Sequence, residues 1–284
     1  MPTYVDAIRE KMASLTSDLE SILGADVLGV FGPILTGVEY RVRAAIEQLP
    51  AHREKLAVVL QTVGGSIEVT ERIVNVIRRH YKEVTFIIPD VALSAGTILV
   101  MSGDAIMMDY FSCLGPIDPQ VERGGKLVPA LSYIEQYQRL VEKSAQGNLT
   151  TAEIALLNKL DLAELHTFEQ AVALSIDLLE KWLTNYKFKD WTKTKTRGLS
   201  VTPAMREDRA REIAVKLNDH QRWRSHGRGI PMKTLTDEDE LNLLVDDFGE
   251  EPALAKAVRE YFEYISNCMV REGLHSFVTS REYA

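Results

Sequence analysis

Apolar residues in the first half of the chain follow two different spacings. Short, mostly apolar runs, at Leu56–Leu60, Val84–Ile88 and Ala105–Met108, are typical of strands buried on both faces of a parallel sheet. Residues 68–81, between the first two runs, place apolar side chains at three- and four-residue steps and predict a helix. Strands that alternate with helices indicate βαβ units. The pattern therefore predicts an α/β protein with a mostly parallel sheet.

Helical spacing dominates both ends of the chain. Residues 4–23 predict an amphipathic helix that packs on its own core or on a neighbouring subunit. After Leu131 the pattern is helical, and Leu241–Val245 is compatible with more than one element. Three segments follow from this: an N-terminal helical arm (1–25), a central α/β domain (26–200) and a helical C-terminal extension (201–284). Further helices are predicted over 133–141, 168–182, 203–217 and 253–269.

Composition narrows the classes of partner. The chain of 284 residues has 33 Lys and Arg against 41 Asp and Glu, a net charge of −8, so nucleic acid is not an expected partner. The densest basic stretch, 187–197, is interpreted as a solvated helix end. The small number of cysteines, Cys113 and Cys268, favours a reducing compartment, and a buried structural role is favoured for Cys113. No leader pattern and no apolar stretch of about 20 residues occurs, so we expect a cytoplasmic protein without a membrane span.

Small residues gather where two of the predicted strands give way to helices. Thr62–Ser66 follows the first apolar run and Ala92–Thr97 follows the second. A strand-to-helix turn directs backbone N–H groups and a side chain toward one point, because the first N–H groups of a helix lack partners within it. Ser94 is thus a candidate nucleophile. The alternative interpretation is that both segments are ordinary β-α turns without a catalytic role.

The same residues carry a family resemblance. Gly64-Gly65-Ser66, Ser94-Ala95-Gly96-Thr97 and the segment Ser112–Gln120 resemble the serine dehydrogenase proteinase family of Clp/crotonase-fold serine peptidases. That family is related to signal peptide peptidase A and to the proteolytic subunit of Clp protease. Similarity is dense from Val30 to Gln120 and returns weakly over His220–Ile230. Val63 departs from the pattern, since relatives commonly have proline there.

The resemblance implies a fold, an activity and an assembly. The fold is Clp/crotonase-like, built from repeated β-α units, and residues 26–200 become its catalytic domain. The activity is that of a serine endopeptidase acting on peptides or unfolded proteins, with no cofactor, in a closed homo-oligomer. Together with the turn geometry, the resemblance makes the N–H groups of Gly65 (or Gly64) and Ala95 the expected oxyanion hole.

The general base is the open question. No histidine lies between His80 and His166, which excludes a histidine at the position that the Clp protease subunit uses. Relatives of the signal peptide peptidase A type use a lysine on a helix instead. Lys143, 49 residues beyond Ser94 on a predicted helix, is our first candidate for this Ser-Lys dyad.

Other side chains are held in reserve as the base. Lys126 lies in a polar glycine-rich loop, and Asp118 lies between two prolines, where an orienting or structural role is favoured. His220 and His226 are six residues apart, which does not match the spacing of two metal ligands on one helical face, so no metal site is expected. Either histidine is a reserve base.

Two other classes of function compete with a peptidase. A crotonase-type acyl-CoA enzyme also uses a glycine-lined oxyanion hole, but it has no need for a serine at position 94. A catalytically silent assembly or interaction protein of the same fold would show no covalent labelling of Ser94.

Overall fold

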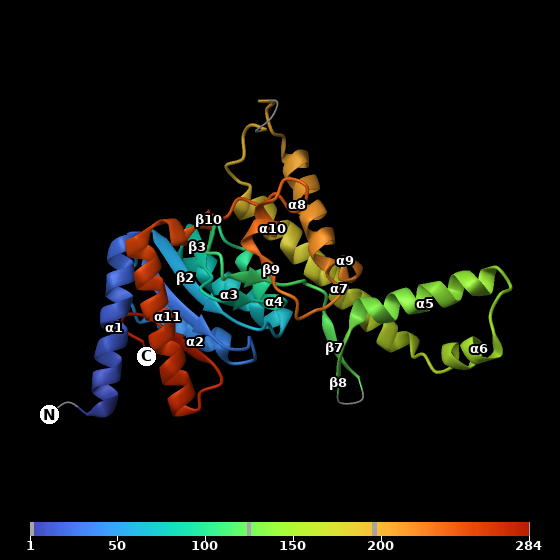
Figure 1. Ribbon diagram of the computed structural model, residues 1–284, viewed down its shortest axis with the longest axis horizontal. Coiled ribbons are helices and arrows are strands. Elements are labelled where there is room, and N and C mark those ends of the chain that lie inside the picture. Colours follow the sequence, from blue (N-terminus) through green and yellow to red (C-terminus); the bar gives the residue numbers. More distant parts are fainter. Residues whose placement is uncertain (1–2, 124–125, 195–197, 284) are drawn as a thin grey trace.

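The structure, a computed structural model, describes residues 3–123, 126–194 and 198–283. It consists of a body built around a six-stranded sheet and a helical arm that projects from one side of the body (Figure 1). Both described ends of the chain lie on the side of the body opposite the arm. The mixed α/β architecture with a mostly parallel sheet confirms the predicted fold class.

The central sheet has the strand order β10-β5-β3-β2-β1-β11. The strands from β10 to β1 are parallel, and β11 pairs antiparallel with β1 at the edge. In β2, Leu56, Val58 and Leu60 pack into one hydrophobic cluster, whereas Ala57 and Val59 pack into another. This strand is buried on both faces, as its unbroken apolar run predicted. The bounds are β1 Asp26–Phe31, β2 Lys55–Gln61, β3 Glu83–Ile87, β5 Ala105–Met108, β10 Asp246–Asp247 and β11 Phe277–Thr279.

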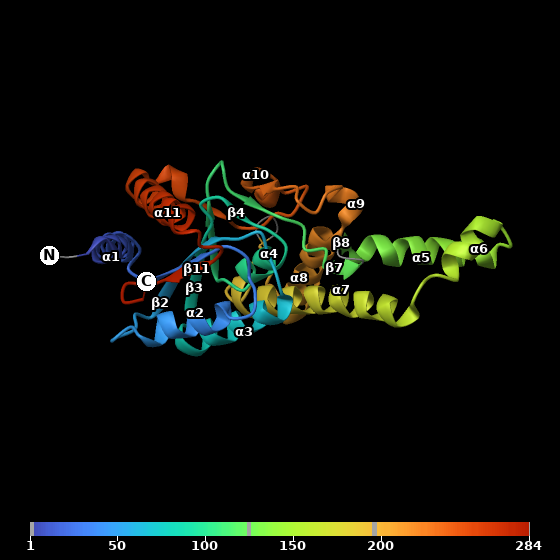
Figure 2. The ribbon, with the colours of Figure 1, turned by 90° about the horizontal axis from the view of Figure 1, so that it is seen from below.

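The two ends of the chain cover one face of this sheet. Helix α1 (Tyr4–Leu23) lies against α11 (Pro252–Glu272), and both bury apolar side chains on the sheet (Figures 1 and 2). Thr3 forms a capping box with Asp6 at the start of α1, and Gly24 ends the helix in the left-handed conformation. Of the two arrangements that the sequence left open for this helix, the chain adopts packing on its own core.

Helices from the middle of the chain cover the opposite face. Ser66 caps α3 by accepting a hydrogen bond from the Val69 N–H (3.1 Å), and Thr202 caps α8, whose first turn contains Pro203. The helices of this layer are α2 (Val38–Glu47), α3 (Ile67–His80), α4 (Ala95–Val100), α7 (Leu162–Trp182), the π-helix η1 (Leu183–Lys187) and α8 (Pro203–Asn218).

A second, small sheet joins segments that are far apart in the sequence. Strand β6 (Cys113–Leu114) lies between β4 (Val91–Ala92) and β9 (Ile230–Pro231). Leu114 is opposite Ala92 on one side and Ile230 on the other. The short helix α9 (His220–Trp223) precedes β9, and α10 (Met232–Thr236) follows it. The end of the segment of weak family similarity, at Ile230, is therefore separated by one strand, β6, from the strand that precedes Ser94.

The arm starts at a hairpin of β7 (Gln120–Arg123) and β8 (Lys126–Pro129). Helix α5 (Ala130–Ala145) then runs outward, α6 (Thr151–Leu157) lies at the far end, and α7 returns to the body (Figure 2). A small hydrophobic cluster holds α5 against α7. In this cluster the rings of Tyr133 and Phe168 meet edge to face, with their centroids 5.5 Å apart. Thr150 and Glu153 form a capping box at the start of α6.

Sequence segments 1–25 and 201–284 are not separate layers. The first contributes α1 to the main body, and the second supplies α11, an edge strand and buried residues of both clusters. Leu241–Val245 has no regular structure, although Leu241 and Leu243 are buried. The 3₁₀ helix η2 (Phe248–Glu250) links β10 to α11.

The basic stretch 187–197 only partly matches its interpretation as a solvated helix end. Lys187 ends the π-helix, and burial lowers its pKa to about 8, so solvation is wrong for this residue. Lys189 forms an ion pair with Asp104 (2.6 Å), and residues 195–197 lie outside the described ranges. Within those ranges, none of the helices combines the length and the apolar character that crossing a membrane requires.

Candidate active site

Ser94 lies at the turn between β4 and α4, where it is the N-cap residue of the helix. Its backbone has φ 53° and ψ −121°, a conformation that residues with a side chain rarely adopt. Such strain costs about 1–3 kcal/mol and persists where the surrounding structure imposes it. The Ser94 side chain makes no capping hydrogen bond and is half-buried, so its hydroxyl is held at the turn without a structural role in α4.

The glycine pair lies directly against Ser94. Gly64 has φ 101°, and a Cβ atom placed on it would stand 2.8 Å from both the Leu93 carbonyl oxygen and the Ser94 Cβ. Gly65 has φ 153°, and a Cβ there would overlap the Ile34 carbonyl. Both positions therefore require glycine on grounds of space as well as conformation.

The two glycine N–H groups point to different surroundings. The Gly64 N–H donates to the Thr62 hydroxyl (3.0 Å). Ile34 pairs with the chain on either side of Gly65, donating to the Gly64 carbonyl (2.8 Å) and accepting from the Ser66 N–H (2.9 Å). In a parallel pairing of this kind, the N–H of the intervening residue points to the other side. The Gly65 N–H thus points away from Ile34.

The first N–H of α4 belongs to Ala95, which has no intrahelical acceptor. Among the described residues, the backbone hydrogen bonds outside helices and strands include no acceptor for the Ala95 or the Gly65 N–H. Two unpaired donors beside a serine hydroxyl are the groups that stabilise a developing oxyanion. Of the two glycines that the sequence offered, Gly65 has the available N–H.

Thr62, whose role the sequence analysis did not identify, holds this turn in place. The backbone of Thr62 pairs with the chain at β4. Its N–H donates to the Val91 carbonyl (2.9 Å), and its carbonyl accepts from the Leu93 N–H (3.0 Å). A Cβ on Gly96 would overlap the Thr62 Cγ2, so glycine permits this close approach. A threonine that directly follows a predicted strand and precedes a glycine pair was the available sequence signal.

The segment Gly115–Asp118 packs over the serine turn. The Gly115 N–H donates to the Thr97 hydroxyl (2.9 Å), and a Cβ on Gly115 would lie 2.8 Å from the Leu93 Cδ2. The Ile117 N–H donates to the Leu217 carbonyl of α8 (3.1 Å). Asp118 is buried, and its carboxylate accepts a long hydrogen bond (3.4 Å) from the Leu131 N–H in the first turn of α5. This contact fits the structural role that the sequence favoured for Asp118.

Lys143 lies near the outer end of the arm. Its ammonium group donates to Glu153 of α6 (2.6 Å), and this hydrogen bond lowers the pKa of Glu153 to about 2. Helix α5 starts beside the body at Ala130 and extends outward for 16 residues, about 24 Å (Figures 1 and 2). Within one chain, the structure does not bring Lys143 next to Ser94.

Of the reserve bases, His226 has the most suitable surroundings. It lies four residues before Ile230, on the segment that β9 attaches beside Leu114. Burial lowers its pKa, and its Nδ1 is buried without a hydrogen-bond partner among the described groups. Lys126 and His220 lie on β8 and α9 respectively, and the structure describes only their backbone.

The sequence analysis favoured a buried Cys113. In the structure this residue is only half-buried. Burial, together with the nearby Asp90, raises the pKa of its thiol, so the thiolate is disfavoured at neutral pH. Cys268 is buried. Among the described residues, no cluster of three or more His, Cys, Asp or Glu side chains could hold a metal ion.

The family model of the ClpP-like SDH-type serine proteinases matches residues 28–220, more than half of the chain. The chain belongs to this family. The matched region contains the glycine pair, Ser94 and the arm, and it ends at α9. Membership establishes a serine proteinase at the level of the family and confirms the resemblance that the motifs carry.

Two uncharacterized proteins of Methanocaldococcus jannaschii are similar in sequence. MJ1495 is 31% identical over 114 residues, which are 40% of this chain and 36% of the relative. MJ0137 is 28% identical over 177 residues, which are 59% of this chain and 58% of the relative. The chain thus spans between about a third and three fifths of the length of these relatives.

Two solved structures align with part of the chain. A mutant of the 1510-N membrane-bound stomatin-specific protease aligns with a TM-score of 0.32 and 20% identity, covering 42% of this chain and 63% of its own. A mutant of ClpP1 from Listeria monocytogenes aligns with a TM-score of 0.30 and 13% identity. The alignment covers 34% of this chain and 57% of the ClpP1 chain. TM-scores this low add nothing to the family assignment.

Proposed function

We propose that this chain is a serine endopeptidase in which Ser94 is the nucleophile and the N–H groups of Gly65 and Ala95 form the oxyanion hole. One observation carries the proposal: the strained Ser94 backbone holds a hydroxyl that does not cap α4 against a glycine pair whose second N–H has no acceptor among the described residues. Family membership supports the reaction class.

The proposed reaction follows from these groups. The Ser94 Oγ attacks the carbonyl carbon of a peptide bond as a base removes the hydroxyl proton. The carbonyl oxygen becomes an oxyanion and accepts hydrogen bonds from Gly65 and Ala95, each worth about 2.7–4 kcal/mol in the transition state. The base then passes its proton to the leaving amine. Water hydrolyses the ester on Ser94 and restores the free hydroxyl.

Two side chains compete as the general base. His226 is supported by its place beside the small sheet, its lowered pKa and its unpaired Nδ1, because a neutral imidazole is ready to accept a proton. Lys143 is supported by the resemblance to lysine-dyad relatives. It would have to leave Glu153 and act on the Ser94 of a neighbouring copy, since its own arm points outward.

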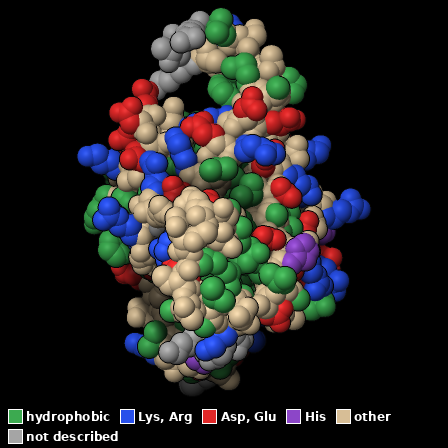
Figure 3. All heavy atoms as spheres, turned by 90° about the vertical axis from the view of Figure 1, so that its right-hand side faces the viewer, with side chains coloured by type: hydrophobic (Ala, Val, Ile, Leu, Met, Phe, Trp, Pro, Cys, Tyr) green, Lys and Arg blue, Asp and Glu red, His purple; other side chains and the backbone are tan. Residues whose placement is uncertain are grey.

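Assembly is part of the proposal. The arm exposes apolar side chains on its outer helices, at Val141, Ile154, Leu156 and Leu162. Figure 3 looks toward the free end of the arm and shows hydrophobic side chains among charged ones on that face. A closed homo-oligomer would cover such surfaces in every copy, and it would shield Ser94 from folded proteins.

Active-site labelling tests the proposal. A fluorophosphonate should modify the native chain once, and peptide mapping by mass spectrometry should place the adduct on Ser94. The Ser94→Ala variant should remain unmodified. Ser66→Ala is the matched control, since Ser66 lies at the same site but caps α3. Labelling at another serine would refute the nucleophile, and absence of labelling would favour a catalytically silent protein.

A further inference from the structure

Thr62 contacts both turns of the candidate active site. It follows the last residue of β2 and is fully buried. Its backbone forms a parallel bridge with Ala92, two residues before Ser94. The hydroxyl and the methyl group of its side chain contact different turns, the hydroxyl at Gly64 and the methyl group at Gly96. Each branch has its own consequence for the proposed oxyanion hole.

The Thr62 hydroxyl holds the first glycine N–H. It accepts a hydrogen bond from the Gly64 N–H (3.0 Å), two residues further along, and so closes a tight local turn. Gly64 is buried, and a buried N–H requires an acceptor. Val63, in the middle of this turn, has an exposed side chain. The hydroxyl therefore holds the peptide between Val63 and Gly64 in one orientation.

The next peptide carries the proposed donor. The Gly64 carbonyl accepts from the Ile34 N–H (2.8 Å). In a trans peptide the carbonyl and the following N–H point in opposite directions, so the Gly65 N–H points away from Ile34. Glycine adopts positive and negative φ with similar ease, so conformational preference does not hold this loop. Two hydrogen bonds hold it instead, one at the Gly64 N–H and one at the Gly64 carbonyl.

The Thr62 methyl group packs on the first turn of α4. A Cβ on Gly96 would overlap the Thr62 Cγ2, so the two residues are in close contact. Gly96 directly follows Ala95, whose N–H is the second proposed donor. A threonine side chain is stiff at χ1, so its hydroxyl and methyl group keep a fixed spacing. One side chain thus links the glycine loop to the start of α4.

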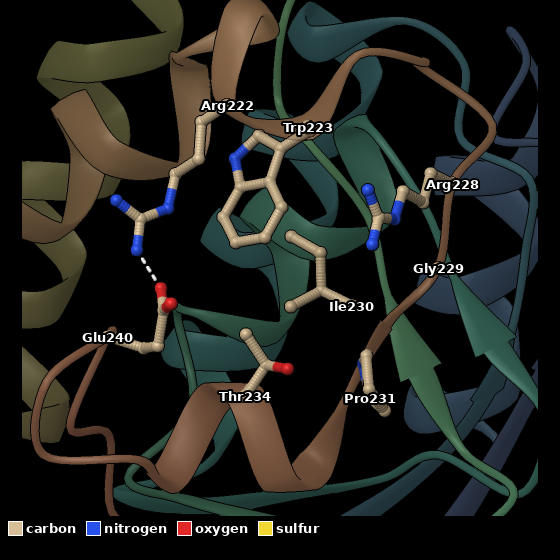
Figure 4. A pocket seen from close by; sticks show the side chains of 8 residues that line it. All are labelled: Arg222, Trp223, Arg228, Gly229, Ile230, Pro231, Thr234 and Glu240. Carbon is tan, nitrogen blue, oxygen red and sulfur yellow. Dashed lines mark ion pairs between the residues drawn. The ribbon is translucent and has the colours of Figure 1, made fainter.

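The other edge of the small sheet is held by residues farther from the glycine loop. Strands β4 and β6 lie between Thr62 and β9. At β9, Ile230 and Trp223 are buried, and Arg222 and Glu240 form an ion pair beside them (Figure 4). These contacts support the sheet from the side that faces away from Thr62.

We propose that Thr62 is a positioning residue of the oxyanion hole, whose hydroxyl orients the Gly65 N–H and whose methyl group sets its spacing from the Ala95 N–H. The effect on catalysis rests on the proposed peptidase function, whereas the orientation of the loop does not. A displaced donor weakens binding of the transition state more than binding of the substrate, because the oxyanion exists only after attack. Loss of the hydroxyl should therefore lower kcat and spare KM.

Two substitutions separate the branches of the side chain. Thr62→Val keeps the shape but removes the hydroxyl, and it should lower kcat about 10- to 100-fold with KM changed less than about twofold. Thr62→Ser keeps the hydroxyl and should lower kcat less than about fivefold. Thr16→Val is the matched control, since Thr16 is also fully buried and its hydroxyl donates to the Met12 carbonyl of α1 (2.8 Å). It should lose stability in urea and keep the native kcat.

A peptide aldehyde and the corresponding alcohol test the hole in the bound state. The Ser94 Oγ bonds to the aldehyde carbon, the π electrons of the carbonyl move to its oxygen, and the base takes the serine proton. The alcohol binds without this reaction. In Thr62→Val the affinity for the aldehyde should fall about tenfold or more, and that for the alcohol should not change. Equal changes for both inhibitors would overturn the proposal.

Hydrogen exchange resolved to single amides tests the loop without turnover. In the native chain the Gly64 N–H should exchange about tenfold or more slowly than the Gly65 N–H, because only the first is bonded to Thr62. Thr62→Val should speed the exchange of Gly64 by a similar factor, whereas Thr62→Ser and Thr16→Val should leave it slow.

Equal exchange of the two glycines in the native chain would overturn the proposal, even if Thr62→Val does not fold. Slow exchange of Gly64 in a folded Thr62→Val variant would also overturn it, as would an unchanged kcat. A native chain that hydrolyses no peptide and yet shows these exchange differences would refute the peptidase function and retain the role of Thr62 in orienting the loop.

Discussion

Gly64 and Ser94 approach each other so closely that a Cβ atom on Gly64 would stand 2.8 Å from the Ser94 Cβ. This contact joins the turn after β2 to the turn after β4, and it fixes the glycine loop relative to the hydroxyl. Both residues have positive φ, which glycine adopts freely but which strains the backbone of Ser94.

Gly64→Ala should reduce turnover about 100-fold or more, because the new methyl group displaces Ser94 from the Gly65 and Ala95 donors. Gly37→Ala is the matched control. Gly37 has a similar φ of 107°, but a Cβ there meets nothing within 4 Å. It should lose about 1–2 kcal/mol of stability and retain its turnover. Steady-state peptide hydrolysis and urea unfolding measure the two effects, and equal turnover in both variants would contradict the proposed contact.

The pH dependence of turnover should identify the base. Burial lowers the pKa of His226, so a His226-dependent rate should rise with pH below about 6.5 and level off by neutral pH. A rate that keeps rising at alkaline pH would instead favour a lysine, because only the neutral amine accepts the proton. His226→Gln and Lys143→Met are compared with exposed controls, His166→Gln and Lys256→Met. The general base is the residue whose variant loses as much activity as Ser94→Ala.

The same histidine should contribute to the pH dependence of stability. The folded-state pKa of His226 lies below its unfolded value, so its contribution is present above about pH 6.5 and is lost as pH falls through the folded value. Urea unfolding at pH 7.5 and 5.0 should therefore show a smaller acid loss in His226→Gln than in the native chain. His166→Gln should behave like the native chain, and identical acid losses in all three proteins would contradict the burial of His226.

Assembly should depend on the arm. Light scattering should give a mass several times that of the 31.9 kDa chain. Leu156→Glu on α6 should shift the mass toward one chain by adding a charge to an apolar contact. Val270→Glu is the control, because Val270 is even more exposed but lies on α11, on the far side of the body. A native monomer with full peptidase activity would refute the assembly.

Local sequence patterns determined much of the fold. Strands β2, β3 and β5 were predicted to within one residue because each is a short, mostly apolar run of the central sheet. The caps of α6 and α8 were also predictable, since a capping side chain bonds to the backbone within three residues of itself. Ser94 and the glycine pair were identified because small residues at a strand-to-helix turn are a local signal.

Tertiary structure decided what depends on contacts between distant segments. The small sheet has two-residue strands without any periodicity, yet it brings Ile230 beside Leu114 and creates the neighbourhood of His226. Only the pairing of Ile34 around Gly65 distinguishes its free N–H from that of Gly64, which Thr62 occupies. The direction of α5, which takes Lys143 away from Ser94, follows from packing against α7. Sequence spacing specifies which residue types recur along an element, whereas the partner of each N–H and side chain is set by long-range packing.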